Sequence, residues 1–427
     1  MRLLFALLCL MVTSTAVFAE NAVFTYVKTV PAADLYEILD KERSEFIAST
    51  PPGAGYEMPS VQPAANDIEI YRVRYESRVP EQGDRKVIGT GLLALPVLKD
   101  RSSLPLMSYQ HGTVLGKYEV PSYAFLPGTP AGDAHHAASF EARYMAGLFA
   151  GGGYALIAAD YFGMGDAAQD PEAFFVKAST QQAEYDLYRD AVQFMKSKGI
   201  TVSDVFLGGW SLGGLNTTGF LEKLQDEGVE VTGSFTAAAP SDPFAALNGL
   251  LFHPRPGVDA LWVNTLVALS VFAFEKYLGP EDLARQTLDP AVYDDMRAIY
   301  ERSYSGQSEL VAILERLGAR PLVAYLKPDL RDPVRFANSD YGRLLAAAET
   351  YRDTFTSPVR MYYGSGDEAL RPLAAKIAAI YQSILIGNAD DQSQNMVSAI
   401  EVKDGNHHAT FVQAAALAKV WMDGLKK

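Results

Sequence analysis

Cysteine is almost absent from this chain of 427 residues, which contains only Cys9. Catalysis by a thiol and metal binding by several thiolates both need cysteine, so we expect neither chemistry here. A hydrophobic content of 48% supplies a large core and excludes intrinsic disorder. Because the buried fraction of the surface rises with chain length, such a core does not depend on disulfides.

An excess of positive charge is also missing. The chain has 37 Lys and Arg against 51 Asp and Glu, which gives a formal net charge of −14 at pH 7. Nucleic-acid binding requires a basic stripe or patch, and no stretch of the sequence supplies one. We therefore expect no nucleic-acid partner.

Apolar runs long enough to cross a membrane are lacking as well. A transmembrane helix needs about 20 apolar residues to span a hydrocarbon layer of ~30 Å. Residues 260–274 carry no charge, but the segment is too short and contains Asn264. It is typical either of a helix buried in its own domain or of a wall of an apolar pocket. We expect no stable membrane span.

The N-terminus has the pattern of an export signal. Arg2 precedes an apolar run at residues 3–12, and Val17-Phe18-Ala19 offers a small residue for cleavage. This pattern predicts a signal peptide at residues 1–19 that is removed after Ala19. The protein would then be periplasmic or secreted, and the mature chain would contain no cysteine.

The remaining chain alternates strand-like and helix-like segments. Residues 20–65 form an N-terminal extension that ends in turn-rich sequence. Two segments of alternating polarity at 68–75 and 87–95 predict antiparallel strands. Short apolar strands separated by helices then predict an α/β class with a mostly parallel sheet covered on both faces. These strands are expected at residues 104–109, 154–159, 205–208, 235–239, 359–363 and 396–402.

Helical spacing indicates the covering helices and an insertion. Helices are expected at residues 140–149, 181–198, 215–225 and 410–425. The helix-rich stretch 244–355 interrupts the alternation and is predicted to form a lid. The catalytic domain then comprises residues 66–243 and 356–427.

Ser211 is the strongest candidate for a nucleophile. It lies in Gly209-Trp210-Ser211-Leu212-Gly213, between an expected strand and an expected helix. A G-x-S-x-G motif in that context is typical of a nucleophile elbow, where the serine occupies a sharp turn that tolerates little bulk on either side. The amide of Leu212 would donate to an oxyanion at this position.

A second oxyanion donor is expected in the loop after the third strand, Tyr109-Gln110-His111-Gly112-Thr113. Thr113 is the preferred donor and Gly112 is the alternative. We expect His111 to buttress this loop rather than to act as a base or ligand.

An acid and a histidine should follow the serine in chain order. Asp367, just after the strand at 359–363, is the preferred acid, and Asp242 after the preceding strand is the alternative. Glu368 is expected to be a solvated charge. His407 is the preferred general base, with its neighbour His408 as the alternative.

Metal binding is not expected, because six histidines without thiolates make a poor zinc site. His135 and His136 are expected to lie on the surface.

Several segments together resemble the secretory lipases and carboxylesterases of the α/β-hydrolase superfamily. The similar segments are residues 108–113, 153–165, 209–213, 364–367 with Pro372, and 406–411. The resemblance implies an α/β-hydrolase fold, hydrolysis of a small-molecule or lipid ester, no cofactor, an acyl pocket under the lid and a structural role for Asp160. Relatives that rely on disulfides differ from this chain, so their lid behaviour is not carried over.

Two other classes of function remain open at this point. An exported serine peptidase would share the triad, although no residue stands out as a grip for a peptide terminus. An acyltransferase or a non-catalytic binding protein could use the same fold.

Overall fold

The computed structural model describes residues 22–126, 139–385 and 396–427. Within these residues the centre is a nine-stranded sheet with the order β1-β2-β3-β5-β4-β6-β7-β8-β9. Strands β1 to β3 are antiparallel, β5 joins β3 antiparallel, and every pairing from β5 to β9 is parallel. The expected α/β class with a mostly parallel sheet is confirmed. The strands are β1 Val23–Val30, β2 Ile68–Val79, β3 Arg85–Pro96, β4 Ser103–Gln110, β5 Ala155–Ala159, β6 Thr201–Trp210, β7 Gly233–Ala237, β8 Val359–Gly364 and β9 Val397–Val402.

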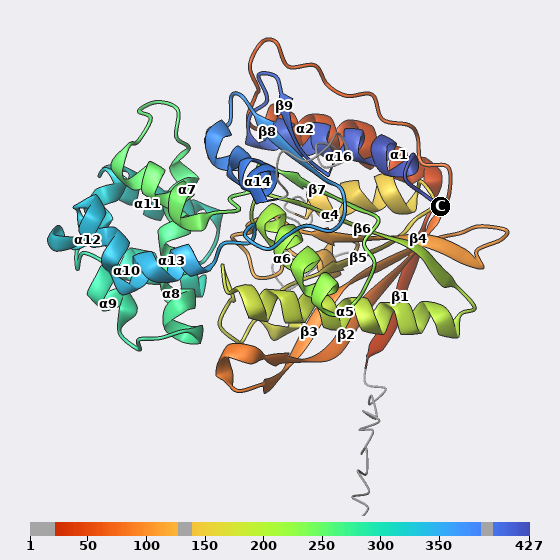
Figure 1. Cartoon of the computed structure of the whole chain (residues 1–427), viewed down its shortest axis with the longest axis horizontal. Helices are drawn as coiled ribbons and strands as arrows, with labels where there is room; N and C mark the ends of the chain where they lie inside the picture. Colours follow the sequence, from red (N-terminus) through yellow and green to blue (C-terminus); the bar gives the residue numbers. More distant parts are fainter. Residues whose placement is uncertain (1–21, 127–138, 386–395) are drawn as a thin grey trace, which may run out of the picture.

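Helices cover both faces of this sheet (Figure 1). One face carries α1, α2, α4 and α16, whose buried side chains share a hydrophobic cluster with the sheet. The other face carries α5, α6 and α14. Because the sheet is covered on both faces, its central strands are buried along their whole length, as every residue of β5 and β7 shows. The helices are α1 Ala32–Glu37, α2 Arg43–Ala48, α4 Phe140–Met145, α5 Lys177–Ser197, α6 Leu212–Asp226, α14 Pro372–Leu385 and α16 His407–Asp423.

The N-terminal extension differs from our expectation, because it is built into the sheet. β1 pairs antiparallel with β2 from Val23 opposite Arg74 to Val30 opposite Ile68. Helices α1 and α2 then bury Leu35 and Ile47 in the same cluster as α16. The turn-rich sequence after residue 48 therefore marks a loop inside the domain and not a domain boundary.

The insertion between β7 and β8 forms a helical cap beside the sheet (Figure 1). The uncharged segment 260–274 serves both of its expected roles. Most of α8 is buried in the core, while Trp262 and Leu266 line a pocket. No helix in the described part of the chain is long and apolar enough to cross a membrane. The cap elements are α7 Pro243–Phe252, a short helix Leu261–Asn264, α8 Thr265–Tyr277, α9 Leu283–Thr287, α10 Tyr293–Glu301, α11 Gln307–Gly318, α12 Pro333–Asn338 and α13 Asp340–Ala347.

Buried polar contacts tie the cap to the catalytic domain. Arg302, just after α10, forms an ion pair of 2.6 Å with Glu172, and both side chains are less than a tenth exposed. The same guanidinium donates to the carbonyl oxygen of Val114 at 3.1 Å. The hydroxyl of Tyr277 donates to the carbonyl of Pro171 at 2.7 Å. Because breaking a buried ion pair leaves an uncompensated charge, these contacts hold the cap against the loops that follow β4 and β5.

Truncation of Leu35 tests whether the extension belongs to the domain. Leu35 is 0% exposed, so Leu35→Ala should lower the free energy of unfolding by about 2–5 kcal/mol through lost burial and a cavity. Tyr36→Ala is the matched control, because Tyr36 is 52% exposed and should change the stability by less than about 0.5 kcal/mol. Urea denaturation measures both. Equal, small effects would show that the extension does not stabilise the domain.

Candidate active site

Ser211 occupies a sharp turn between the end of β6 and the start of α6. Its backbone has φ 55° and ψ −121°, a conformation that is strained for a residue with a side chain. The turn is held because the Ser211 amide donates to the carbonyl of Ala237 at 2.8 Å. A Cβ atom at Gly209 would lie 2.2 Å from the Gly213 carbonyl oxygen, and one at Gly213 would lie 1.9 Å from that of Gln110. Only glycine fits at either position, so the motif has the steric form of a nucleophile elbow.

The two expected oxyanion donors lie beside Ser211. Leu212 is the first residue of α6, where backbone N–H groups have no carbonyl partner within the helix. Thr113 lines the same cavity as Ser211 and Leu212. The amide of Gly112, the alternative donor, instead donates to the carboxylate of Glu141 at 2.8 Å. The structure therefore brings Thr113 to the cavity and uses the Gly112 amide elsewhere.

Asp367 and His407 form a buried pair. Nδ1 of His407 lies 3.0 and 3.2 Å from the two carboxylate oxygens of Asp367, and both residues are 2% exposed. The amides of Ala369 and Leu370 also donate to Asp367, at 2.8 and 2.7 Å. These bonds fix the carboxylate, which in turn fixes the orientation of the imidazole.

Asp242 is not brought to this pair. Its carboxylate accepts from the amide of Ala245 at 2.8 Å and so caps the N-terminus of α7. Its second oxygen accepts from the hydroxyl of Tyr351 at 3.0 Å. The aspartate therefore stabilises the start of the cap.

His408 faces away from Asp367. Its ring stacks on Phe46 with a centroid distance of 4.3 Å, and its Nδ1 lies 3.4 Å from the Ser49 hydroxyl. Burial, together with the neighbouring His407, lowers the pKa of His408 to about 4. Consecutive residues at the start of a helix point about 100° apart, so α16 can turn only one of the two rings toward the acid.

His407 has the electrostatic environment of a general base. Burial alone would lower its pKa, but the charge and hydrogen bond of Asp367, with the charges of Glu368 and Glu141, raise the pKa above the usual 6.5. Its Nε2 is buried and makes no hydrogen bond within the described residues, so this nitrogen can accept a proton. The bond between a nucleophile and its base is often long or poorly aligned until substrate binds.

Glu368 is not the solvated charge that we expected. Its carboxylate accepts from the backbone amide of His407 at 3.0 Å, and its own carbonyl accepts from the amide of Ala260 at 3.1 Å. Trp210 of the elbow donates from Nε1 to the carbonyl of His407 at 3.1 Å. The His407 backbone is therefore held both by the elbow and by the loop after β8 that carries Asp367 and Glu368, which we call the acid loop.

His111 and Asp160 have structural positions. His111 is buried, its Nδ1 lies 2.8 Å from the Gly112 carbonyl oxygen, and its ring stacks on Tyr161. Burial lowers the pKa of His111 to about 4, so the ring stays neutral. Asp160 accepts from the amide of Ser122 at 2.9 Å and from Thr90 at 2.6 Å. Both residues support the loop below the site.

His135 and His136 lie outside the described residues. Among the residues 22–126, 139–385 and 396–427, no group of three or more His, Cys, Asp or Glu could hold a metal ion.

Glu141 is a buried residue beside the site that sequence reasoning missed. Its carboxylate accepts from the Tyr109 hydroxyl at 2.5 Å and from the Gly112 amide at 2.8 Å, and burial raises its pKa to about 7. Helical spacing predicts the helix that carries it. Nothing in that spacing indicates that a glutamate points inward.

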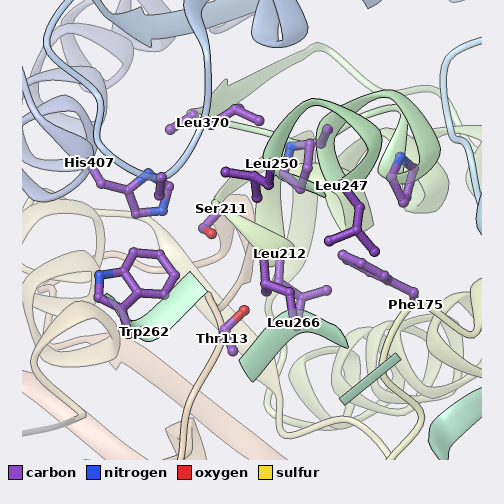
Figure 2. Close-up of a pocket in the computed structure, with 15 residues that line it drawn as sticks. Thr113, Phe175, Ser211, Leu212, Leu247, Leu250, Trp262, Leu266, Leu370 and His407 are labelled. Atoms are coloured by element: carbon purple, nitrogen blue, oxygen red, sulfur yellow. The ribbon is translucent and has the colours of Figure 1, made fainter. Parts of the chain in front are cut away.

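Ser211 and His407 open onto one apolar cavity (Figure 2). In Figure 2, His407 and Trp262 lie on one side of Ser211, and Leu247 and Phe175 lie on the other. Among the described residues the lining contains no Asp, Glu, Lys or Arg. The lining residues are Thr113, Phe175, Ser211, Leu212, Ala238, Pro240, Pro243, Ala246, Leu247, Leu250, Trp262, Leu266, Ala369, Leu370 and His407.

The sheet order, the elbow after β6 and the acid and histidine after β8 and β9 define an α/β-hydrolase. The chain belongs to the alpha/beta hydrolase family, whose sequence model matches residues 124–420. No curated protein matches the sequence.

Solved structures share this fold at low sequence identity. A protein from Legionella pneumophila superposes with a TM-score of 0.73 and 16% identity, covering 95% of this chain and 98% of its own. The rice cell wall degrading esterase LipA from Xanthomonas oryzae gives 0.68 and 14%, covering 95% and 98%. Candida antarctica lipase A gives 0.58 and 15%, covering 80% and 73%. The similarity extends over nearly the full length of the two bacterial proteins.

Replacing each histidine in turn tests which of the two serves Ser211. His407→Ala should lower ester hydrolysis by about 10³-fold or more, since it removes the group that pairs with Asp367. His408→Ala should keep most of the activity and lose some stability, because its ring packs on Phe46. The measurement is kcat on a p-nitrophenyl ester, with thermal unfolding as the control for folding. Equal, mild losses would exclude both histidines from the mechanism.

Proposed function

We propose that this chain is an exported serine hydrolase that cleaves carboxylic esters through an acyl-enzyme on Ser211. The observation that carries the proposal is the convergence of three features on one apolar cavity. These are the elbow serine, the buried Asp367–His407 pair, and Leu212 and Thr113 beside the serine. This is the set of groups that acyl transfer requires.

Each group has a defined role in the proposed reaction. His407 Nε2 takes the proton of the Ser211 hydroxyl as the oxygen attacks the ester carbonyl, and Asp367 stabilises the resulting imidazolium. The amides of Leu212 and Thr113 donate to the tetrahedral oxyanion. His407 then returns the proton to the departing alcohol. Water, activated by the same histidine, releases the acid from Ser211.

The cavity supports an ester with an uncharged acyl group. Leu247, Leu250 and Leu266 of the cap provide an apolar wall next to Ser211. Burial of each methylene there contributes about 0.8 kcal/mol to binding, which favours an alkyl chain over a polar group. The known activity of LipA as an esterase and of the Candida protein as a lipase also supports this substrate class.

A serine peptidase is less well supported. A peptidase that trims chain ends needs a charged group to bind the terminus, and the described lining of the cavity offers none. An acyltransferase would require an alcohol in place of water at the second step.

An ester and peptide panel tests the proposed reaction. The chain should turn over p-nitrophenyl acyl esters in a series of chain lengths and leave aminoacyl anilides intact. Ser211→Ala should lower ester turnover by roughly 10³-fold or more and abolish labelling by a fluorophosphonate. An unchanged ester rate in the variant would exclude Ser211 as the nucleophile. Turnover of the anilides without turnover of the esters would instead support the peptidase.

Export is proposed from the signal-like sequence at residues 1–19. N-terminal sequencing of the protein recovered from the periplasm or medium of a bacterial host should find Glu20 as the first residue. Recovery of the chain only from the cytoplasm with Met1 intact would contradict export.

A further inference from the structure

Glu141 lies beneath the loop that carries Thr113, with its side chain 5% exposed. Glu141 is the second residue of α4, and its side chain reaches the end of β4. One carboxylate oxygen accepts two hydrogen bonds, from the Gly112 amide at 2.8 Å and from the Tyr109 hydroxyl at 2.5 Å. Bonds from donors to a buried carboxylate are charge-assisted and stronger than neutral ones. Glu141 therefore ties the strand end and the loop to α4.

Gly112 is held on both sides of its Cα atom. Glu141 accepts from its N–H, while its carbonyl oxygen lies 2.8 Å from Nδ1 of His111. The Gly112 carbonyl and the Thr113 N–H belong to one planar trans peptide, in which they point in opposite directions. Fixing the carbonyl therefore fixes the direction of the Thr113 amide.

A glycine at this position needs such restraints. A Cβ atom on Gly112 would lie 3.0 Å from the Trp210 ring, so a larger residue would crowd the elbow. Glycine avoids that contact but populates more backbone conformations than other residues. Without the bond to Glu141, the peptide before Gly112 could rotate, and the following peptide would lose its alignment.

We propose that Glu141 is a positioning residue for the oxyanion site, which holds Gly112 so that the Thr113 amide is aligned with the reacting carbonyl of an ester on Ser211. This inference rests on the proposed esterase function. Glu141 does not touch the substrate and acts through the Gly112 and Thr113 peptides.

The charge of Glu141 also acts on His407. The charged groups that face the imidazole are Asp367 and Glu368 from the acid loop and Glu141 from α4, and His408 is its neighbour on α16. The three carboxylates raise the pKa of His407. The base works in its neutral form, so activity falls as pH drops through this raised pKa. Glu141 carries its charge only above its own raised pKa of about 7. Removing that charge lowers the pKa of His407, and the loss of activity in the range above about pH 7 then shifts to lower pH.

Glu141→Gln and Glu141→Asp separate alignment from charge. The Gln variant keeps an oxygen that can accept from Gly112 but loses the charge that strengthens this bond. We therefore expect kcat to fall about 10-fold with KM within about twofold, less than the loss from removing an oxyanion donor outright. The acid limb of its pH profile, which is the pH range in which kcat falls as His407 becomes protonated, should also move to lower pH. The Asp variant withdraws the carboxylate from Gly112 but keeps a charge, so kcat should fall while the acid limb stays nearer that of the parent. The measurements are kcat and KM on a p-nitrophenyl ester from pH 5 to 9, with circular dichroism to check folding.

Glu184→Gln is the matched control. Glu184 lies on α5 and is as buried as Asp367, at 2% exposure. It lines a neighbouring cavity that contains none of Ser211, His407 and Thr113. This variant should retain the kcat and the acid limb of the parent. Burial raises the pKa of Glu184 well above its usual value, so this control replaces a buried carboxyl group without removing a charge. If it loses as much as Glu141→Gln, the effect reflects replacement of any buried carboxyl group and the proposal is wrong.

The outcomes distinguish this inference from the esterase proposal. A parent chain that hydrolyses none of the esters overturns the esterase function itself. If the parent is active and the Glu141 variants have the same kcat and the same acid limb as the parent, only the role of Glu141 is overturned. This holds whatever the stability of the variants. If neither Glu141 variant folds, Tyr109→Phe, which leaves the carboxylate in place, should lower kcat about 3-fold or more through the weakened Glu141 contact. An unchanged kcat in that variant also overturns the role.

Discussion

The contact of Gly213 with Gln110 is the constraint on which the site depends. Three backbone segments meet there: the end of β4, the end of β6 and the first turn of α6. The space between them admits no Cβ atom, since one on Gly213 would lie 1.9 Å from a carbonyl oxygen. This close approach forces Ser211 into its strained conformation and brings the loop after β4 alongside the N-terminus of α6. Ser211, Leu212 and the loop that carries Thr113 are thus positioned by one packing contact.

A second set of contacts positions the histidine relative to this turn. Trp210, inside the elbow, donates to the His407 carbonyl, and Glu368, next to the acid, accepts from the His407 amide. The backbone of the base is therefore held by the elbow on one side and by the acid loop on the other. The charges of Asp367, Glu368 and Glu141 raise the pKa of this imidazole and so favour its protonated form.

The cap is part of this arrangement and does more than cover the cavity. Through Arg302 it contacts the carbonyl of Val114, one residue beyond Thr113, and through Ala260 it contacts the acid loop. Its α7 and α8 provide the apolar wall beside Ser211. The apolar cavity and the loops that carry Thr113 and Asp367 are consequently coupled by direct contacts, so the shape of the cavity and the alignment of the loops depend on the same cap residues.

The sequence by itself determined the α/β class, the strand and helix order, the elbow at Ser211 and the short set of candidates for the acid and the base. These features depend on local periodicity and on motifs of a few residues, which a single sequence displays directly. Only the tertiary structure decided that Asp367 meets His407, that Asp242 caps α7 and that His408 packs on Phe46. It also decided that β1 joins the sheet and that Glu141 lies below the oxyanion loop. The reason is that each of these outcomes depends on which face of a helix or strand meets a partner distant in the chain, and that choice is made by packing and burial rather than by neighbouring residues.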